Sequence, residues 1–458
     1  MGASTPEAAA RKGGAGGQPA RTTVARKRDG LVFLAGAAAA ALVLLGAPSV
    51  PGPAARIGAS SLLLLPPYAA AVDPVTAAVR TFYDDPELAY TVDRRVTGWD
   101  AKRAEWLRSR GLAGGGGGAG TTPERVVMVS GSQPAPCKGA GGDHMLLRFL
   151  KNKVDYCRLH GIELLYNRAV LHPAMAGYWA KIPIVRAAML AHPEAEWVWW
   201  VDEDAVFTDM DFSLPLAKYA SRNFVLYGWP ERFFKRKSWL GINAGVFLIR
   251  NCQWSLDFMD EWARMGPAWP EHARWGRTIR AALAEKDDDV ACDQSALAYL
   301  LLHNWPRLGN KTHVETEYAL QGYWEPIVGW LDAAAARYEA VERRRGAAGL
   351  RRRHAEREHL RFAAARNAAM AEAVPGPAGG GEAGWRRPLI THFVGCQPCG
   401  GGRNPVYSRR SCDEGMRRAL DLADDQVLRA YGFRHAAPLD DAVVPLPFDY
   451  PAARARKG

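Results

Sequence analysis

The most constraining segment of this chain is a short apolar run that stops at three carboxylates. Residues 197–201 are all tryptophan or valine, and Asp202, Glu203 and Asp204 follow them directly. A run of this kind is typical of a strand that is buried on both faces. Open α/β sheets bind their ligands at the carboxyl ends of their strands, and the three acids fall at such an end. The segment therefore predicts a charged site at the edge of a sheet.

Three adjacent carboxylates at the end of a core strand need compensation, because burying even one unpaired carboxylate is costly. A divalent cation that also binds a diphosphate would supply it through hard oxygen ligands. The simpler alternative is a solvated acidic turn that caps a helix, and short Asp-x-Asp strings are common by chance. The hydrophobicity of the preceding strand favours the metal site.

Strands and helices alternate along the rest of this region. The pattern predicts strands at 125–129, 163–166, 223–229, 242–249 and 389–395, and helices at 143–160, 179–192 and from 293 to about 302. Alternation of this kind is typical of a parallel sheet with helices on both faces. We therefore expect an α/β fold with a Rossmann-like nucleotide-binding arrangement.

Small residues occur where two of these strands could meet a ligand. Ser130, Gly131 and Ser132 are predicted to form a polar turn after the first strand, where backbone N–H groups can approach a nucleotide. Gly245 lies inside a strand, two residues after Asn243, and indicates close approach of a ligand or of another backbone.

Two further candidates are ambiguous from the sequence. Asp293 opens a helix together with Gln294, so its carboxylate could equally serve as an N-terminal cap. His392 is a lone histidine in a strand and becomes a ligand candidate only if it lies beside the carboxylates.

The formal net charge of +11 could indicate nucleic acid, a membrane surface or an acidic substrate. Much of the excess lies in the N-terminal tail and between residues 343 and 361, and no basic recognition helix with interleaved aromatic residues is present. Nucleic acid is therefore not an expected partner. The basic residues 351–353 are instead expected to form one face of a solvated helix.

The seven cysteines suit neither a disulfide-dense small domain nor a zinc ribbon. Cys396 and Cys399 form a lone C-x-x-C pair without a second pair at zinc spacing. We expect one or two structural disulfides, with an odd thiol left over.

Residues 31–47 form an uncharged apolar run directly after a basic cluster, close to the lower length limit for crossing a bilayer. A cleaved signal peptide is the alternative, but its apolar region is usually shorter. The basic flank predicts a type II orientation, and the sequon at Asn310 would carry a glycan in a lumenal domain. The predicted organisation is a cytosolic tail at 1–29, a transmembrane anchor at 30–50, a stem at 51–122, a catalytic domain at 123–435 and a C-terminal tail at 436–458.

Seven strings occur in order within residues 125–435: Val129–Gln133, Lys151–Cys157, Tyr178–Lys181, His192–Trp197, Asn243–Ser255, Gly322–Trp324 and Thr391–Cys396. Together they resemble the plant α-glycosyltransferases of family 34, the xyloglucan xylosyltransferases and galactomannan galactosyltransferases. The resemblance implies a GT-A fold, a UDP-sugar donor, Mn²⁺, transfer with retention of anomeric configuration and a polysaccharide acceptor. It also implies a Golgi membrane location, and it leaves open a homodimer or a heterodimer with related transferases.

The resemblance also implies roles for individual residues. Asp202, Asp204 and His392 would bind the metal, and Asp293 and Gln294 would lie near the donor sugar and the reacting carbon. The expected donor-binding residues are Ser130, Gly131, Ser132, Asp202, Asn243, Gly245 and Gln397. A front-face substitution, in which the leaving phosphate takes the acceptor proton, fits the lack of an obvious nucleophilic carboxylate, and a double displacement stays open.

Three positions depart from the family pattern. Glu203 replaces the usual serine, and Cys292 stands where the family commonly has a second aspartate. Gln397 is typical of galactosyltransferase-like members, whereas xylosyltransferase members tend to have lysine there. We therefore expect UDP-galactose as the donor, with UDP-xylose as the alternative. An inactive scaffold in a polysaccharide-synthesising complex is a further alternative.

Overall fold

The structure is a computed structural model, and it describes residues 82–112, 125–344, 347–351, 358–374, 376, 384–399, 403–437 and 442–446. All of these fall within one unit of the chain, residues 78–458. The predicted cytosolic tail and anchor lie outside the described residues, as do most of the stem and most of the basic run at 351–353. Within the described ranges, no helix is both long enough and apolar enough to cross a membrane.

Six strands form the central sheet in the order β2-β1-β3-β6-β5-β7. β1 runs parallel to β2 and β3, and β5 runs parallel to β7, whereas β6 is antiparallel to its neighbours β3 and β5. The α/β class is confirmed, but the prediction of a parallel sheet is wrong for β6. The strands are β1 Val126–Gly131, β2 Glu163–Asn167, β3 Trp197–Val201, β5 Phe224–Gly228, β6 Ile242–Arg250 and β7 Thr312–Glu315.

The connection between β5 and β6 accounts for the antiparallel strand. A parallel neighbour needs a crossover, usually an α-helix. Here the chain makes only one π-helical turn, Glu231–Lys235, and one 3₁₀ turn, Trp239–Gly241, before it returns beside β5. The residue pattern predicts the two strands but not their relative direction.

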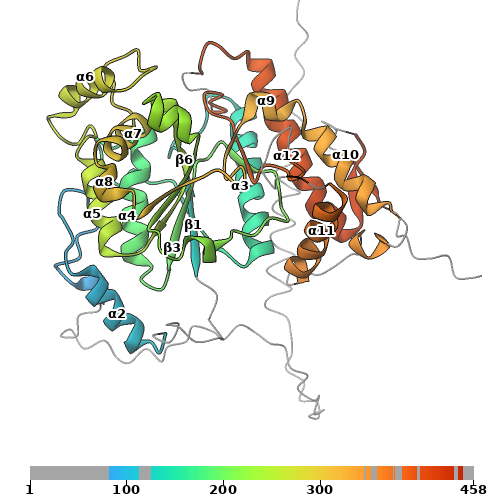
Figure 1. Cartoon of the computed structure of the whole chain (residues 1–458), viewed down its shortest axis with the longest axis horizontal. Coiled ribbons are helices and arrows are strands. Elements are labelled where there is room, and N and C mark those ends of the chain that lie inside the picture. The colour runs from blue at the N-terminus through green and yellow to red at the C-terminus, as the bar shows by residue number, and fades with distance from the viewer. Residues whose placement is uncertain are drawn as a thin grey trace, which may run out of the picture. The chain divides into compact units, whose positions relative to one another are not determined.

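Helices cover both faces of this sheet (Figure 1). Along β3, Val198 and Trp200 pack in the cluster that includes α4, α5 and α7, and Trp197, Trp199 and Val201 pack in the cluster that includes α3 and α12. Side chains alternate between the faces of a strand, so the apolar run fills both cores. The helices named here are α3 Ala140–His160, α4 Lys181–Ala191, α5 Gln253–Ala263, α7 Asp293–His303 and α12 Arg409–Tyr431.

A second, three-stranded sheet begins just after the carboxyl end of β3. Its order is β4-β9-β8, and β9 is antiparallel to β4 and parallel to β8. Its strands are β4 Ala205–Phe207, β8 Gly322–Tyr323 and β9 Ile390–His392. The remaining α-helices and the last strand pair are α2 Trp99–Ser109, α6 His272–Ala282, α8 Trp305–Leu308, α9 Trp324–Val328, α10 Leu331–Glu342, α11 His359–Ala373, β10 Phe433–His435 and β11 Val443–Pro445.

The folded part of the chain begins before the predicted domain boundary at residue 123. Trp99, which opens α2, is fully buried, and its indole N–H donates to Asn251 Oδ1 at 2.8 Å. Arg103 forms an ion pair with Glu196 at 3.0 Å. Residues 82–112, expected in a stem, therefore pack on the catalytic domain. At the other end, β11 pairs with β10, so part of the predicted tail is also folded.

Two predicted elements have shifted bounds. The helix expected at 179–192 is a 3₁₀ turn, Gly177–Ala180, followed by α4. β1 continues through Ser130 and Gly131, which were expected in the turn.

Candidate active site

The turn between β3 and β4 is built from the predicted carboxylates. The Asp202 backbone N–H donates to the Gly245 carbonyl at 2.8 Å, which ties the turn to β6. From α3, the buried Lys153 ammonium donates to the backbone carbonyls of Glu203 at 2.8 Å and Ala205 at 3.0 Å. Because a strand follows, this acidic string is not a helix cap.

His392 reaches the turn because β9 pairs with β4 in a register that places Ala205 opposite His392. Its Nε2 atom lies 3.0 Å from Asp204 Oδ1 and 3.8 Å from Asp202 Oδ2. One potential ligand atom from each of these three residues lies within 4.8 Å of the others. Two carboxylates and an imidazole suit a divalent cation such as Mn²⁺. Asp202, Asp204 and His392 are called the metal cluster below.

The charge state of the metal cluster also suits a cation. Burial raises the pKa of the Asp204 carboxyl, but the adjacent His392 outweighs this effect, and the pKa is lowered from its ordinary value. Asp204 therefore stays ionised at neutral pH. Asp202 is fixed by its own neighbour, since the Trp200 indole N–H donates to Asp202 Oδ1 at 2.6 Å.

Gly245 is required by the metal cluster itself. A Cβ atom at this position would lie 2.2 Å from His392 Cε1 and 2.8 Å from Asp202 Oδ2. A ligand or another backbone was expected close to this glycine, but the group that approaches it is a side chain, the His392 ring. The Asn243 side-chain oxygen accepts a hydrogen bond from the Gly245 N–H at 2.6 Å, which fixes the strand beside the ring.

Lys181 is a functional candidate that the sequence analysis left without a role. Its Nζ atom lies 2.7 Å from Asp293 Oδ2 and 3.1 Å from Asp202 Oδ1. Burial lowers the pKa of this ammonium, but the two carboxylates outweigh it and raise the pKa above its usual value. Lys181 thus joins the metal cluster to the start of α7. The available signal was a lysine that begins a helix whose other residues, apart from Arg186, are apolar.

Asp293 and Gln294 both lie in the site, at the start of α7. Cys292 is the N-cap residue, so the capping alternative for Asp293 does not hold. Gln294 Oε1 accepts from the Ala244 N–H, and its Nε2 donates to the Trp239 carbonyl, each at 3.3 Å. Gln294 therefore connects α7 with β6.

The carboxyl end of β1 forms the opposite side of the site. Gly131 approaches β2 closely, since a Cβ atom there would lie 2.3 Å from the Asn167 carbonyl oxygen. Gly131 and Ser132 line the cleft, whereas Ser130 is fully buried in β1 and does not.

Glu203, the departure from the family pattern, points toward β2. Its Oε2 accepts a hydrogen bond from the Tyr166 hydroxyl at 2.6 Å. Burial raises the pKa of this carboxyl. Glu203 is not among the three residues whose potential ligand atoms lie together.

Two disulfides hold the loop that carries Gln397. Cys399 bonds to Cys137 in the segment after β1, and Cys396 bonds to Cys412 in α12. The prediction of structural disulfides rather than zinc is confirmed for the C-x-x-C pair. The free cysteines among the described residues are Cys157, Cys252 and Cys292, not a single odd thiol.

These elements enclose one cleft of about 570 Å³. Four carboxylates and one lysine line it, so its wall carries an excess of negative charge. Asn310, the predicted glycosylation site, is exposed between α8 and β7 and lies apart from the cleft. The predicted residues that line the cleft are Gly131, Ser132, Asp202, Asp204, Asn243, Gly245, Asp293, Gln294, His392 and Gln397.

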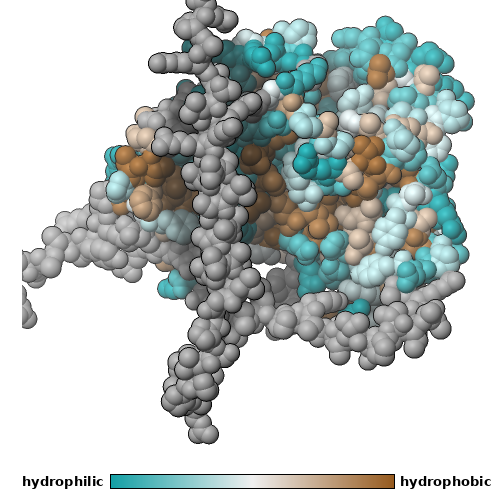
Figure 2. Space-filling model, turned by 180° about the vertical axis from the view of Figure 1, so that it is seen from behind, coloured by the Kyte–Doolittle hydropathy of each residue, from teal (hydrophilic) through white to brown (hydrophobic). Residues whose placement is uncertain are grey.

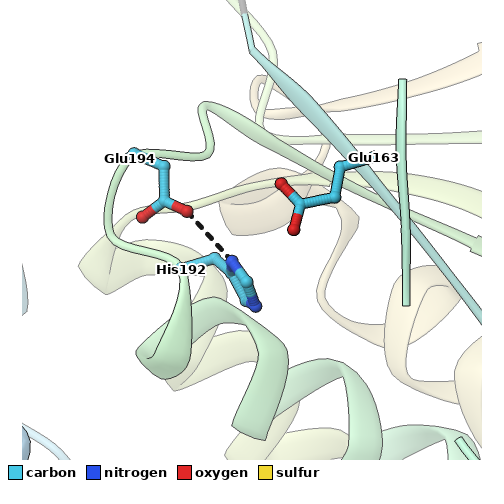
Figure 3. A group of neighbouring side chains, drawn as sticks. All are labelled: Glu163, His192 and Glu194. Atoms are coloured by element: carbon cyan, nitrogen blue, oxygen red, sulfur yellow. Dashed lines mark hydrogen bonds and ion pairs between the residues drawn. The ribbon is translucent and has the colours of Figure 1, made fainter. Parts of the chain in front are cut away.

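A second group of potential ligands lies at the opposite ends of the strands from the cleft, where β2 begins and α4 ends. Figure 3 shows His192 between Glu163 and Glu194, with its Nδ1 atom 3.0 Å from Glu194 Oε1. Contact with Glu194 raises the pKa of His192, and the histidine lowers the pKa of Glu194 against the effect of burial. A local ion pair accounts for this group.

Comparison with known proteins agrees with these observations. Residues 122–402 match the galactosyl transferase GMA12/MNN10 family. Probable glycosyltransferase 6 of Oryza sativa subsp. indica is 59% identical, over 97% of this chain and 98% of that protein. Galactomannan galactosyltransferase 1 of Cyamopsis tetragonoloba is 50% identical, over 81% of this chain and 82% of that protein.

A solved glycosyltransferase involved in glycosylation of the major capsid of PBCV-1 is 13% identical, with a TM-score of 0.33, over 64% of this chain and 98% of that chain. The sequence relatives are decisive, because they are similar across the whole catalytic region. The expected resemblance to family 34 is confirmed. This chain belongs to the galactosyl transferase GMA12/MNN10 family and is a glycosyltransferase.

Proposed function

We propose that this chain transfers galactose from UDP-galactose to the backbone of a cell-wall hemicellulose, with retention of anomeric configuration and with Mn²⁺ as cofactor. The observation that carries the proposal is a single cleft in which the metal cluster lies beside the Lys181–Asp293 ion pair. Similarity to a galactomannan galactosyltransferase supports galactose as the sugar. The same proposal includes a GT-A arrangement, in which the nucleotide binds at the carboxyl end of β1.

Residues on the two sides of the metal cluster would have different tasks. When bound, the cation would neutralise charge on the leaving diphosphate. On the β1 side, Gly131 and Ser132 would let the backbone approach the nucleotide. On the β6 side, Lys181 would hold Asp293 beside the donor sugar, and the contacts with Ala244 and Trp239 would hold Gln294 there.

The transfer step proposed is a front-face substitution. The acceptor hydroxyl oxygen bonds to the anomeric carbon while the bond from that carbon to UDP breaks. The electron pair leaves with UDP, and the hydroxyl proton passes to the leaving phosphate. The ion pair of Asp293 with Lys181 favours a positioning role over nucleophilic attack, because attack would require this carboxylate to leave its buried partner.

The direct test is to incubate the full chain with UDP-galactose or UDP-xylose and with manno- or cello-oligosaccharides, with and without Mn²⁺. We expect galactosyl transfer to a manno-oligosaccharide that stops when the metal is chelated, and NMR of the product should show an α linkage. Transfer of xylose alone, or a β-linked product, would contradict the proposal.

Donor choice is proposed to depend on Gln397, which is exposed at the cleft wall. Galactose has one more hydroxymethyl group than xylose, and a neutral side chain that donates and accepts can bind that hydroxyl. A lysine would be a longer point charge that favours phosphate. Gln397→Lys should therefore lower the ratio of UDP-galactose to UDP-xylose turnover by up to roughly tenfold. An unchanged ratio would remove Gln397 from donor selection.

The location proposed for the chain is the Golgi membrane, in a type II orientation with the anchor at residues 30–50. Because Asn310 is exposed, a lumenal catalytic domain should carry a glycan there. Asn310→Gln should abolish the mobility shift produced by an endoglycosidase. A C-terminus that protease digests in intact vesicles would contradict the orientation. Light scattering of the purified chain would show whether it forms a homodimer.

A further inference from the structure

Exposed apolar side chains gather unevenly on this protein. Seen from behind, hydrophobic patches lie between hydrophilic ones (Figure 2). Single exposed apolar residues are ordinary on a protein surface, but a group beside a cleft often marks a binding surface. One such group lies in the connection from β2 to α4, where Val170 is 48% exposed, Leu171 43% and Tyr178 49%. Val170 and Tyr178 also line the catalytic cleft.

Tyr178 is held in a fixed place at the cleft rim. It belongs to the 3₁₀ turn Gly177–Ala180, and Gly177 enters this turn with a φ of 59°, a conformation that favours glycine. The next residue, Trp179, is buried, and its indole N–H donates to the Ala291 carbonyl at 3.1 Å. The turn is thus attached to the segment that leads into α7, while the Tyr178 ring stays half exposed.

This position is close to the proposed reacting centre. Lys181 follows three residues later and contacts Asp293 at 2.7 Å. Burial raises the pKa of the Tyr178 hydroxyl, and the nearby Cys292 and Asp293 raise it further. Trp179 contacts Ala291, and Tyr178 lines the same cleft as Asp293, so this turn lies beside the start of α7, where the donor sugar is proposed.

The chemistry of the ring suits a sugar acceptor. A pyranose presents an apolar face of C–H groups and an edge of hydroxyls, and an aromatic ring offers a flat apolar surface at little cost in conformational entropy. We propose that the exposed face of Tyr178 is an acceptor subsite that stacks on a pyranose of a β-linked oligosaccharide. This inference rests on the proposed function, and it names the residue that holds the acceptor.

The test measures acceptor binding directly, so that it does not depend on turnover. Mannohexaose and cellohexaose are titrated calorimetrically into the full chain, and UDP with Mn²⁺ is titrated separately. Tyr178→Ala should weaken binding of the preferred hexaose by about tenfold, and Tyr178→Phe should retain it within about twofold, because the ring face and not the hydroxyl makes the contact. UDP affinity should not change. Tyr431→Ala removes a tyrosine of similar exposure in α12 and should change the affinity for neither ligand.

No hexaose binding by the unmodified chain would overturn the assignment, and so would any of three results with the variants. The first is a hexaose affinity that Tyr178→Ala leaves intact. The second is a parallel loss of UDP affinity, which would assign the ring to the nucleotide. The third is an equal loss in Tyr178→Phe, which would assign the effect to the hydroxyl. Failure of the proposed function would look different: the hexaose would bind, but no galactose would be transferred to it.

Discussion

Two Asp-x-Asp strings lie close together in this chain and end in opposite environments. Asp202 and Asp204 line an open cleft, where one lysine and one histidine face them. Asp209 and Asp211 are buried beside three arginines, Arg366, Arg386 and Arg387. The string is the same in both places. Its role is decided by the positive groups that the fold brings to it.

The second string is neutralised by the protein itself. Arg366, from α11, forms two hydrogen bonds with Asp211, and Arg387 lies between Asp209 and Asp211 at 3.3 and 3.4 Å. Guanidinium groups keep their charge even when buried. Burial alone would raise the pKa of the Asp211 carboxyl, but the Arg366 guanidinium lowers it far below its ordinary value. This cluster therefore has no surplus charge with which to attract a cation, whereas the cleft does.

The largest expected effect tests the first string. Asp204→Asn keeps the size of the side chain and removes the negative charge of one potential ligand in the metal cluster. Turnover of UDP-galactose should fall by about a thousandfold, because the charge that develops on the diphosphate loses several kcal/mol of stabilisation. Thermal unfolding without metal should shift downward, because His392 lowers the pKa of Asp204 and so stabilises its ionised form in the folded protein. Retained Mn²⁺-dependent turnover would show that Asp204 is not a ligand.

The matched change in the second string should act on stability instead. Asp211→Asn leaves Arg366 and Arg387 with an incomplete set of charged partners in a buried site. We expect a loss of about 3–5 kcal/mol in the free energy of unfolding, measured by urea denaturation. Turnover measured below the unfolding transition should stay close to that of the unmodified chain. A stable variant without activity would reverse the roles of the two strings.

A smaller effect concerns pH and the same buried region. His160 Nε2 lies 2.9 Å from the Met210 carbonyl, in the middle of the second string, and burial lowers the pKa of His160 to about 4. The unfolded chain binds this proton near pH 6.5, so native stability should fall as the pH drops from 6.5 toward 4, by up to about 3 kcal/mol. His160→Gln should flatten the dependence of stability on pH in this window. Equal slopes for both proteins would show that His160 does not titrate this way.

The sequence predicted those parts of the site that depend on local patterns. An apolar run followed by acids identified β3 and the metal cluster turn, because a strand buried on both faces places whatever follows it at the edge of the sheet. Gly245 was recognisable because glycine inside a strand needs a reason, and the reason is the His392 ring at 2.2 Å from a would-be Cβ. The family resemblance supplied His392, which no local pattern identifies.

The parts that sequence reasoning missed depend on contacts between distant segments. In the sequence, Lys181 looks like a surface residue at the start of a helix. Only the fold shows that α7 places Asp293 beside it. The arginines that neutralise Asp211 come from positions more than 150 residues later in the chain. Trp99 lies within residues 51–122, which were assigned to a stem because they are rich in Pro, Ala and Gly, and only the packing against Asn251 reveals its place. Ion pairs and packing contacts between distant segments leave no regular spacing of residues in the sequence.

The most direct test of the central claim is Mn²⁺ binding measured by electron paramagnetic resonance, with UDP present. The unmodified chain should remove free Mn²⁺ from solution with a stoichiometry of one ion. Asp204→Asn and His392→Ala should lose this uptake, whereas Asp211→Asn, held under conditions where it stays folded, should retain it. Uptake that persists in Asp204→Asn and disappears in Asp211→Asn would place the metal at the buried string and contradict the account.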